Sequence, residues 1–380
     1  IRLYTEVGRR GMTMYKCPIL YYMENLIFNR DKSCWAAFKL RGFDYDFLNE
    51  NEKTLVLFQT ARFLAGISSE VQILVIPVEQ DITMHYRALK EGLDREDPLY
   101  ETSLDYTDQV EAYLKERTME TEGNDYRTYL FVKLEDISGN DLVSDLRHAW
   151  QFFVSDPANA INVYMNTDTR DILMSRVERL RKAAGDWYFS QNQKMSMSEV
   201  EGEELQWLFR RTAYRGMKEA VPLFYQDTRK GVWKPKCHMD RIGSETVIRP
   251  WSRDIVNLFS GSITSRDRVV RVEHDGCVSW QTFLVLPGLP DEWEFPGNEW
   301  LYTLQKENLQ AEVCIHIRAT ECREAQRKID LKKREIDSQS ENAEKGGAEI
   351  PEDLYTGREY AAALEGEIKT NKDPILNTSI

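Results

Sequence analysis

The sequence has few histidines and no phosphate-binding loop, and both features narrow the chemistry open to it. Its 380 residues include 5 histidines. A nucleotide-binding loop needs glycines that free backbone N–H groups and a lysine that meets the phosphates, in the pattern G-x-x-x-x-G-K-[ST]. That pattern is absent, as are the G-x-G-x-x-G fingerprint and the G-x-S-x-G nucleophile turn. We therefore predict no catalytic residue and no cofactor-binding residue.

The chain also lacks an excess of positive charge. Its formal net charge is -13 at pH 7. Domains whose main task is to grip nucleic-acid phosphates usually carry a concentrated positive excess, so the charge disfavours that class. Residues 94–125 hold eleven Asp or Glu against three Lys or Arg. We interpret this cluster as a solvated helix face rather than an acidic binding patch.

No apolar run approaches the roughly 18 to 20 residues that a membrane-spanning helix needs. The nearest candidate, residues 15–28, is interrupted by Lys16, Pro18 and Glu24. Because proline breaks a helix and disfavours the middle of a sheet, we predict a packed or partner-bound strand there and no direct insertion into lipid.

The cysteines lack the close spacing of a metal site or a disulfide framework, which is typical of reduced cytosolic proteins. They are Cys17, Cys34, Cys237, Cys277, Cys314 and Cys322. Three pairs could in principle contribute to a zinc site: His274 and Cys277 flank a turn, Cys237 and His238 are adjacent, and Cys314 and His316 share one face of a strand. Without C-x₂-C or H-x₃-H spacing, ordinary cysteines and histidines are favoured and no metal ligand is predicted.

The chain contains alternating strand and helix patterns that predict an α+β fold. At 42% hydrophobic and 30% charged residues, the composition is that of a globular protein. Strands are predicted over 35–43, 71–80 and 126–134. The helix predicted over 51–67 is apolar around most of its circumference, so we expect it to be deeply buried. We predict mixed β-sheets covered by helices, with a helical middle region and a charged helical hairpin near the C-terminus.

Helical stripes in the middle of the chain predict core packing. A cap at Ser198 and Glu201 is expected to start the last of these helices. The stripes comprise Leu142, Leu146, Ala149, Trp150 and Phe153; then Leu173, Val177, Leu180 and Ala184; and then Leu205, Trp207, Leu208 and Phe209.

In the last third of the sequence, a hairpin is predicted over 269–286, since Asp275-Gly276 supplies a tight turn. A strand is predicted over 311–319. Residues 318–345, with eight basic and seven acidic side chains, predict an exposed helix, and a second helix starting at Pro351 is expected to form a hairpin with it. The predicted organisation is a docking arm over 1–30, an α+β subdomain with the helical middle over 31–229, and a second α+β subdomain over 230–380.

Residues 15–48, 51–67 and 71–81 resemble the amino-terminal region of the cytoplasmic ATPase of type IV secretion systems, the VirB/TraC/TrbE class. The likeness is to the version carried by conjugative transposons and plasmids of Gram-positive bacteria. Residues 279–319 resemble a second segment of that family.

The resemblance implies a non-catalytic docking and assembly region that couples a motor to the inner-membrane complex for DNA transfer. In that family ATP and Mg²⁺ belong to a carboxyl-terminal motor domain, before which we expect this chain to stop. The implied partners are inner-membrane subunits of a conjugation channel, with self-association through the parent ATPase. The implied location is cytoplasmic, at the inner face of the cell membrane, reached through partners.

An open strand edge is a ready site for an added strand, so the apolar segment near the N-terminus is the predicted docking site. It consists of Ile19, Leu20, Tyr21, Tyr22 and Met23. Two alternatives stand beside docking. One is a metal-dependent hydrolase that uses carboxylates or Cys and His. The other is a domain that contacts single-stranded DNA through residues 230–236 and 249–254, where tryptophan lies beside basic side chains.

Overall fold

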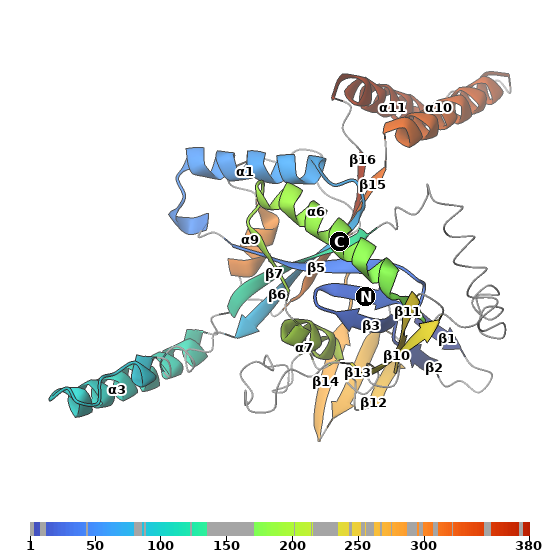
Figure 1. Ribbon diagram of the computed structural model, residues 1–380. Helices are drawn as coiled ribbons and strands as arrows, with labels where there is room; N and C mark the ends of the chain where they lie inside the picture. Colours follow the sequence, from blue (N-terminus) through green and yellow to red (C-terminus); the bar gives the residue numbers. More distant parts are fainter. Residues whose placement is uncertain are drawn as a thin grey trace.

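The computed structural model has an α+β fold, which confirms the predicted class (Figure 1). It describes residues 4–7, 13–42, 45–79, 86, 89–121, 124–134, 171–200, 202–213, 215, 235–242, 245–251, 255, 262–266, 268–274, 276–286, 295, 299–306, 311–320, 322–345, 351–371 and 375–380.

The largest sheet has eight strands and organises the molecule. Its order is β16-β15-β6-β7-β5-β4-β3, with β9 also pairing β5, and the pairings are antiparallel. The bounds are β3 (Ile19–Met23), β4 (Leu26–Asn29), β5 (Cys34–Leu40), β6 (Glu70–Glu79), β7 (Asn124–Leu134), β9 (Met197–Glu199), β15 (Val313–Thr320) and β16 (Ile375–Ser379). Strands from 1–30, 31–229 and 230–380 therefore share one sheet, and the predicted boundaries do not divide it.

In the part of the chain that the structure describes, three smaller antiparallel sheets accompany it. The first pairs β1 (Tyr4–Val7) with β2 (Thr13–Lys16), and the second has the order β10-β11-β8. The third has the order β12-β13-β14. The remaining bounds are β8 (Ile172–Leu173), β10 (Cys237–Ile242), β11 (Glu245–Pro250), β12 (Ser262–Arg266), β13 (Val269–His274) and β14 (Cys277–Thr282).

The predicted hairpin over 269–286 is confirmed by β13 and β14. The two strands close with His274 opposite Cys277, and Gly276 in the connection has φ 80°. Glycine adopts this left-handed backbone without a Cβ clash, so the sequence places the reversal where its chemistry allows it.

Alternate residues of the central strands fill two buried clusters. Phe38 and Leu130 belong to the first, on which α6 (Met174–Asn192) packs, whereas Ala37 and Tyr129 belong to the second, to which α7 (Gly202–Ala213) contributes. Because side chains alternate across a strand, the central sheet is buried on both faces. The predicted core stripes of these helices are confirmed by the burial of Val177, Leu180, Ala184, Leu205, Trp207, Leu208 and Phe209. Leu173, predicted in the same stripe, instead lies half-buried in β8, opposite Val247 of β11.

The prediction of a helix over residues 51–67 is confirmed, but the prediction that this helix is deeply buried is wrong. The helix is α1 (Glu50–Ala65), begun by a capping box between Asn49 and Glu52. Of its side chains only Phe63 is buried, against Trp187 of α6, while Phe58 is 63% exposed. The reason is tertiary: α1 meets the rest of the fold near its C-terminal end, so an all-round apolar pattern does not guarantee burial.

The predicted helix cap at Ser198 is also wrong. Ser198 lies in β9, opposite Lys39 of β5, and α7 begins at Gly202. The backbone groups of Ser198 belong to a strand pairing, which a sequence pattern for helix caps does not reveal. The predicted stripe over residues 142–153 lies outside the described residues.

The helices α3, α10 and α11 extend away from the central sheet in Figure 1. Helix α3 spans Tyr100–Thr121, with Tyr106 and Tyr113 exposed. The others, α10 (Cys322–Lys345) and α11 (Glu352–Asn371), confirm the predicted charged helical hairpin. It packs through Ala325, Ile329 and Ile368, with Lys333 paired to Glu365. The short helices are η1 (Tyr45–Phe47) and α9 (Trp300–Lys306).

We expect Phe38→Ala to lower the free energy of unfolding by about 3–5 kcal/mol. Phe38 is fully buried and stacks at 5.2 Å between ring centroids on Trp187. Urea unfolding measures the change. The matched control is Phe58→Ala on the exposed side of α1, expected within about 0.5 kcal/mol of the original chain. Equal losses in the two variants would contradict the core described above.

A charge cluster links three neighbouring strands of the sheet. Glu70 of β6 lies 2.8 Å from Lys133 Nζ of β7, 2.7 Å from His316 Nε2 of β15 and 3.4 Å from Arg318 Nη2 of β15. Burial alone would raise the pKa of the Glu70 carboxyl. The hydrogen bond from Lys133 and the charges of Lys133, His316 and Arg318 outweigh burial and hold that pKa below its ordinary value.

This cluster predicts a pH dependence in the acid range. A carboxyl whose pKa is lower in the folded state stabilises the fold above its unfolded pKa of about 4.3, and the contribution is lost as the pH falls through the folded pKa. We expect urea midpoints to fall less between roughly pH 6 and pH 3 in Glu70→Gln than in the original chain. Parallel pH profiles for the two proteins would rule out this contribution of Glu70.

Candidate interaction surface

A run of exposed apolar side chains begins in β14 and continues past its end; we call residues 277–286 the β14 strip. Trp280 is 66% exposed and Leu284 is 89% exposed. The exposed apolar side chains are Val278, Trp280, Phe283, Leu284, Val285 and Leu286. The strip contains no Asp, Glu, Lys or Arg, although charged residues make up 30% of the chain. Exposed apolar patches of this kind commonly mark sites of protein contact.

The strip's alternation is the reverse of an ordinary half-buried strand, because its polar side chains point inward. Ser279 and Gln281 are buried, whereas Val278 and Trp280 on the opposite face are exposed. Buried polar groups require hydrogen-bond partners. Here the partner of both is Arg215: the Ser279 hydroxyl donates to its backbone oxygen at 2.5 Å, and its guanidinium donates to Gln281 Oε1 at 3.2 Å.

Arg215 is itself held by a buried carboxylate. Its Nε lies 2.6 Å from Oε2 of Glu312, which directly precedes β15. Arg211 of α7 pairs with the same carboxylate and also donates to the backbone oxygen of Pro77 in β6 at 2.8 Å. The Arg211–Glu312–Arg215 triad therefore ties α7, β15, β6 and β14 together, and it fixes which face of β14 turns outward.

Both arginines of the triad stay charged at neutral pH. Burial lowers the pKa of Arg211 and of Arg215 to about 10 in each case. For Arg211 the neighbouring positive charge of Arg215 adds to the effect. A pKa near 10 leaves each guanidinium protonated at pH 7, so Glu312 meets two positive charges.

A second polar group holds α7 against the sheet. Glu204 accepts a hydrogen bond from the Tyr129 hydroxyl at 2.6 Å and pairs with Lys39 Nζ at 2.9 Å. The buried ring of Trp207 lies under two guanidinium groups, with its centroid 6.0 Å from Arg127 Cζ and 5.7 Å from Arg211 Cζ. These contacts position the arginine side of α7 toward β14 and β15.

The far end of the strip is also anchored. The Leu286 N–H donates to the Ile380 backbone oxygen at 3.1 Å. Ile380 directly follows β16, so the strip begins in the three-stranded sheet and ends beside the eight-stranded one. The exposed apolar side chains are therefore carried by a backbone held at both ends.

The predicted docking segment lies elsewhere and is not an open surface. Its residues form β3, and each of Ile19, Leu20, Tyr21 and Tyr22 is at most 5% exposed, with Met23 partly buried. Although β3 ends the strand order of the large sheet, its side chains belong to the two core clusters. The apolar side chains of the segment therefore serve the core, while the backbone of β3 keeps its terminal place in the sheet. That this edge accepts an added strand stays a prediction.

The cysteine and histidine pairs singled out in the sequence are not assembled into a metal centre. His316 pairs with Glu70, His238 with Asp240 at 2.8 Å, and Cys314 Sγ accepts from Gln72 at 2.9 Å. Within the ranges that the structure covers, no group of three or more His, Cys, Asp or Glu is arranged to hold a metal ion.

In the basic and aromatic segment over 249–254, Arg249 is engaged with acids, while residues 252–254 lie outside the described part. Trp251 is exposed, but Arg249 pairs with Asp240 and, at 3.3 Å, with Asp171. Its charge is thus compensated rather than presented to a phosphate. Residues 230–234 of the other segment lie outside the described part.

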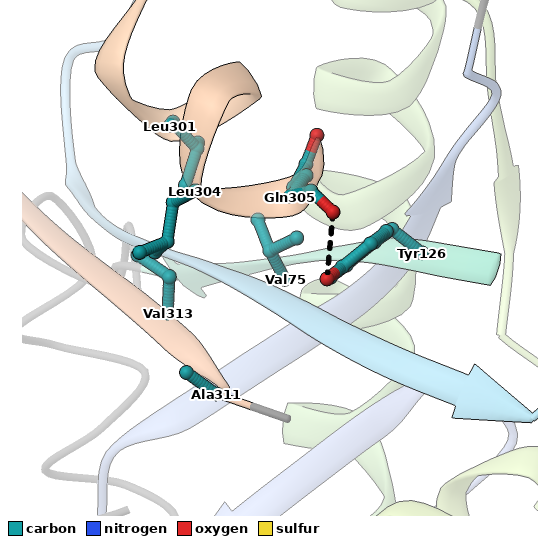
Figure 2. A pocket seen from close by; sticks show the side chains of 7 residues that line it. All are labelled: Val75, Tyr126, Leu301, Leu304, Gln305, Ala311 and Val313. Carbon is teal, nitrogen blue, oxygen red and sulfur yellow. Dashed lines mark hydrogen bonds between the residues drawn. The ribbon is translucent and has the colours of Figure 1, made fainter. Parts of the chain in front are cut away.

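The crevice beneath α9 is lined mainly by aliphatic side chains and is nearly filled by them (Figure 2). It leaves no room for even a water-sized molecule, whereas ligand pockets typically enclose roughly 300–1,000 Å³. The Tyr126 hydroxyl donates across it to the Gln305 backbone oxygen at 3.3 Å. The lining residues are Val75, Tyr126, Leu301, Leu304, Gln305, Ala311 and Val313.

No protein-family model matches this chain, and no curated protein is significantly similar to it. In the parts of the chain that the structure describes, no helix has both the length and the apolar character to cross a membrane.

The sequence pattern indicated the hairpin but not the exposed strip. A usable signal was present, because ten consecutive uncharged residues, CVSWQTFLVL, follow the turn at Gly276. The sequence does not show which side chains of the strip face outward, since either face of an alternating strand can turn inward. The contacts of Arg215 decide that question.

We expect Glu312→Gln to lower the free energy of unfolding by about 2–3 kcal/mol, less than the loss from a fully buried pair, because two partly buried guanidinium groups lose their counter-charge. Glu341→Gln is the matched control, since Glu341 pairs with Lys345 on the exposed surface of α10 at 3.4 Å. Its expected loss is under about 1 kcal/mol. Urea unfolding compares the two, and a loss at Glu312 no larger than at Glu341 would argue against the triad's structural role.

Proposed function

We propose that this chain is the non-catalytic docking and assembly region of a conjugation ATPase of the type IV secretion class. The observation that carries the proposal is the β14 strip, an uncharged apolar surface held outward by the Arg211–Glu312–Arg215 triad. Such a surface suits binding to protein, because association removes apolar area from water without stripping water from charges.

The resemblance of residues 15–81 and 279–319 to that ATPase class supplies the biological setting. In this proposal the chain acts at the inner face of the cell membrane through channel subunits, and nucleotide turnover belongs to a separate motor domain. The chain itself binds no ATP and contributes contacts that join the motor to its assembly during DNA transfer. The projecting helices α3, α10 and α11 give it further surface for such contacts.

Cell fractionation tests the docking role. We expect the tagged chain to sediment with membranes in cells that carry the genes of a conjugation channel and to stay in the supernatant in cells without them, because recruitment depends on protein partners. The purified chain is expected to release no phosphate from ATP. Equal membrane fractions in the two cell types, or ATP turnover by the purified chain, would overturn the proposal.

A further inference from the structure

The strand part of the β14 strip, Cys277–Thr282, is a sheet edge among the described residues. In the order β12-β13-β14, β14 is terminal and pairs only with β13 among the described strands. Residues of an antiparallel strand alternately direct their backbone groups toward the neighbouring strand and away from it, so about half of the N–H and C=O groups of β14 point away from β13. In natural proteins, a charged side chain, a proline or a bulge usually prevents an edge strand from pairing with another chain. Residues 277–286 contain no charged residue and no proline.

From this edge we propose that the β14 strip pairs antiparallel with the same strip of a second copy of this chain. The pairing would join two three-stranded sheets into one six-stranded sheet across a two-fold axis. An antiparallel pairing of identical strands is self-complementary, so it closes as a dimer and leaves no further β14 edge for growth.

The exposed apolar side chains give a dimer apolar area to bury. The six of them expose roughly 700 Å² of surface, of which edge-to-edge pairing covers a part; a standard interface takes about 800 Å² from each partner. Trp280 and Phe283 provide the aromatic anchors that dominate the energetics of such surfaces.

The charge distribution favours contact between two copies at the β14 strip over contact elsewhere. Each copy carries a net charge of -13, so two copies repel across most approaches. The strip brings no acidic side chain to the contact. Beside it, Arg271 of β13 lies with Cζ 5.8 Å from the Trp280 ring centroid and pairs with Glu273 at 2.7 Å, so the neighbouring charges are compensated locally.

The β12–β14 sheet lies at one end of the molecule, opposite the α10–α11 hairpin (Figure 1). A second copy can therefore approach β14 without meeting that hairpin. The inference deepens the proposed assembly role and rests on it for its biological meaning. The self-pairing itself is a property of the purified chain, so it can fail while membrane recruitment succeeds, and the reverse.

Sedimentation-velocity ultracentrifugation of the purified chain tests the pairing. Interfaces of this size range from micromolar to picomolar in Kd, so we expect a dimer at about 10 µM. Trp280→Lys is expected to shift the chain to monomer, because two like charges then meet across the axis. Phe58→Lys on α1, an equally exposed aromatic position that receives the same charge, is expected to remain dimeric.

Charge complementation distinguishes a defined interface from general adhesion. An equimolar mixture of Trp280→Lys and Trp280→Glu is expected to recover a dimer, whereas each variant alone stays monomeric. Leu284→Lys is a second variant expected to disrupt the dimer. Because Leu284 lies outside the strand and is 89% exposed, this substitution is expected to disturb folding less than Trp280→Lys does. Circular dichroism melts confirm that each variant folds. A monomeric original chain, a polydisperse aggregate, or no recovery in the mixture would overturn the proposal.

Discussion

The pairing of Glu312 with Arg211 and Arg215 is the interaction on which the arrangement of this protein's surface depends. It joins a helix on one face of the large sheet to a strand of that sheet and to a strand of a separate sheet. Buried ion pairs contribute little net stability, because desolvation opposes the attraction. Their value here is orientation: Arg215 satisfies the inward polar side chains of β14, and the apolar ones consequently face water.

The outward orientation of the apolar side chains of β14 links the packing of the protein to its proposed docking function. A strand with apolar residues outward and no charge costs free energy in an isolated chain, and such a surface is stable in water only when small or when covered by another protein. The core does not need this strand's apolar side chains, since the two clusters on the large sheet are filled by other residues. The strip is therefore surplus to folding, which makes association its most direct physical use.

Several elements could be predicted because local chemistry decides them. The hairpin at Gly276, the core stripes of α6 and α7 and the charged hairpin of α10 and α11 follow from turn geometry and helical periodicity. The exposure of α1 could not be predicted, and for β3 the sequence left a packed strand and a partner-bound strand open. Both are apolar, yet α1 is exposed along most of its length and β3 is buried, because the space beside each is set by distant parts of the chain.

The sequence by itself determined the α+β class, the position of the turns and the uncharged character of residues 277–286. Those properties arise from neighbours along the chain, whose spacing is fixed by covalent geometry. Only the tertiary structure decided which apolar segments became core and which became surface. The reason is that burial depends on contacts between residues far apart in sequence: Arg215 meets Glu312 and Gln281 across 97 and 66 positions, and no local pattern encodes that meeting.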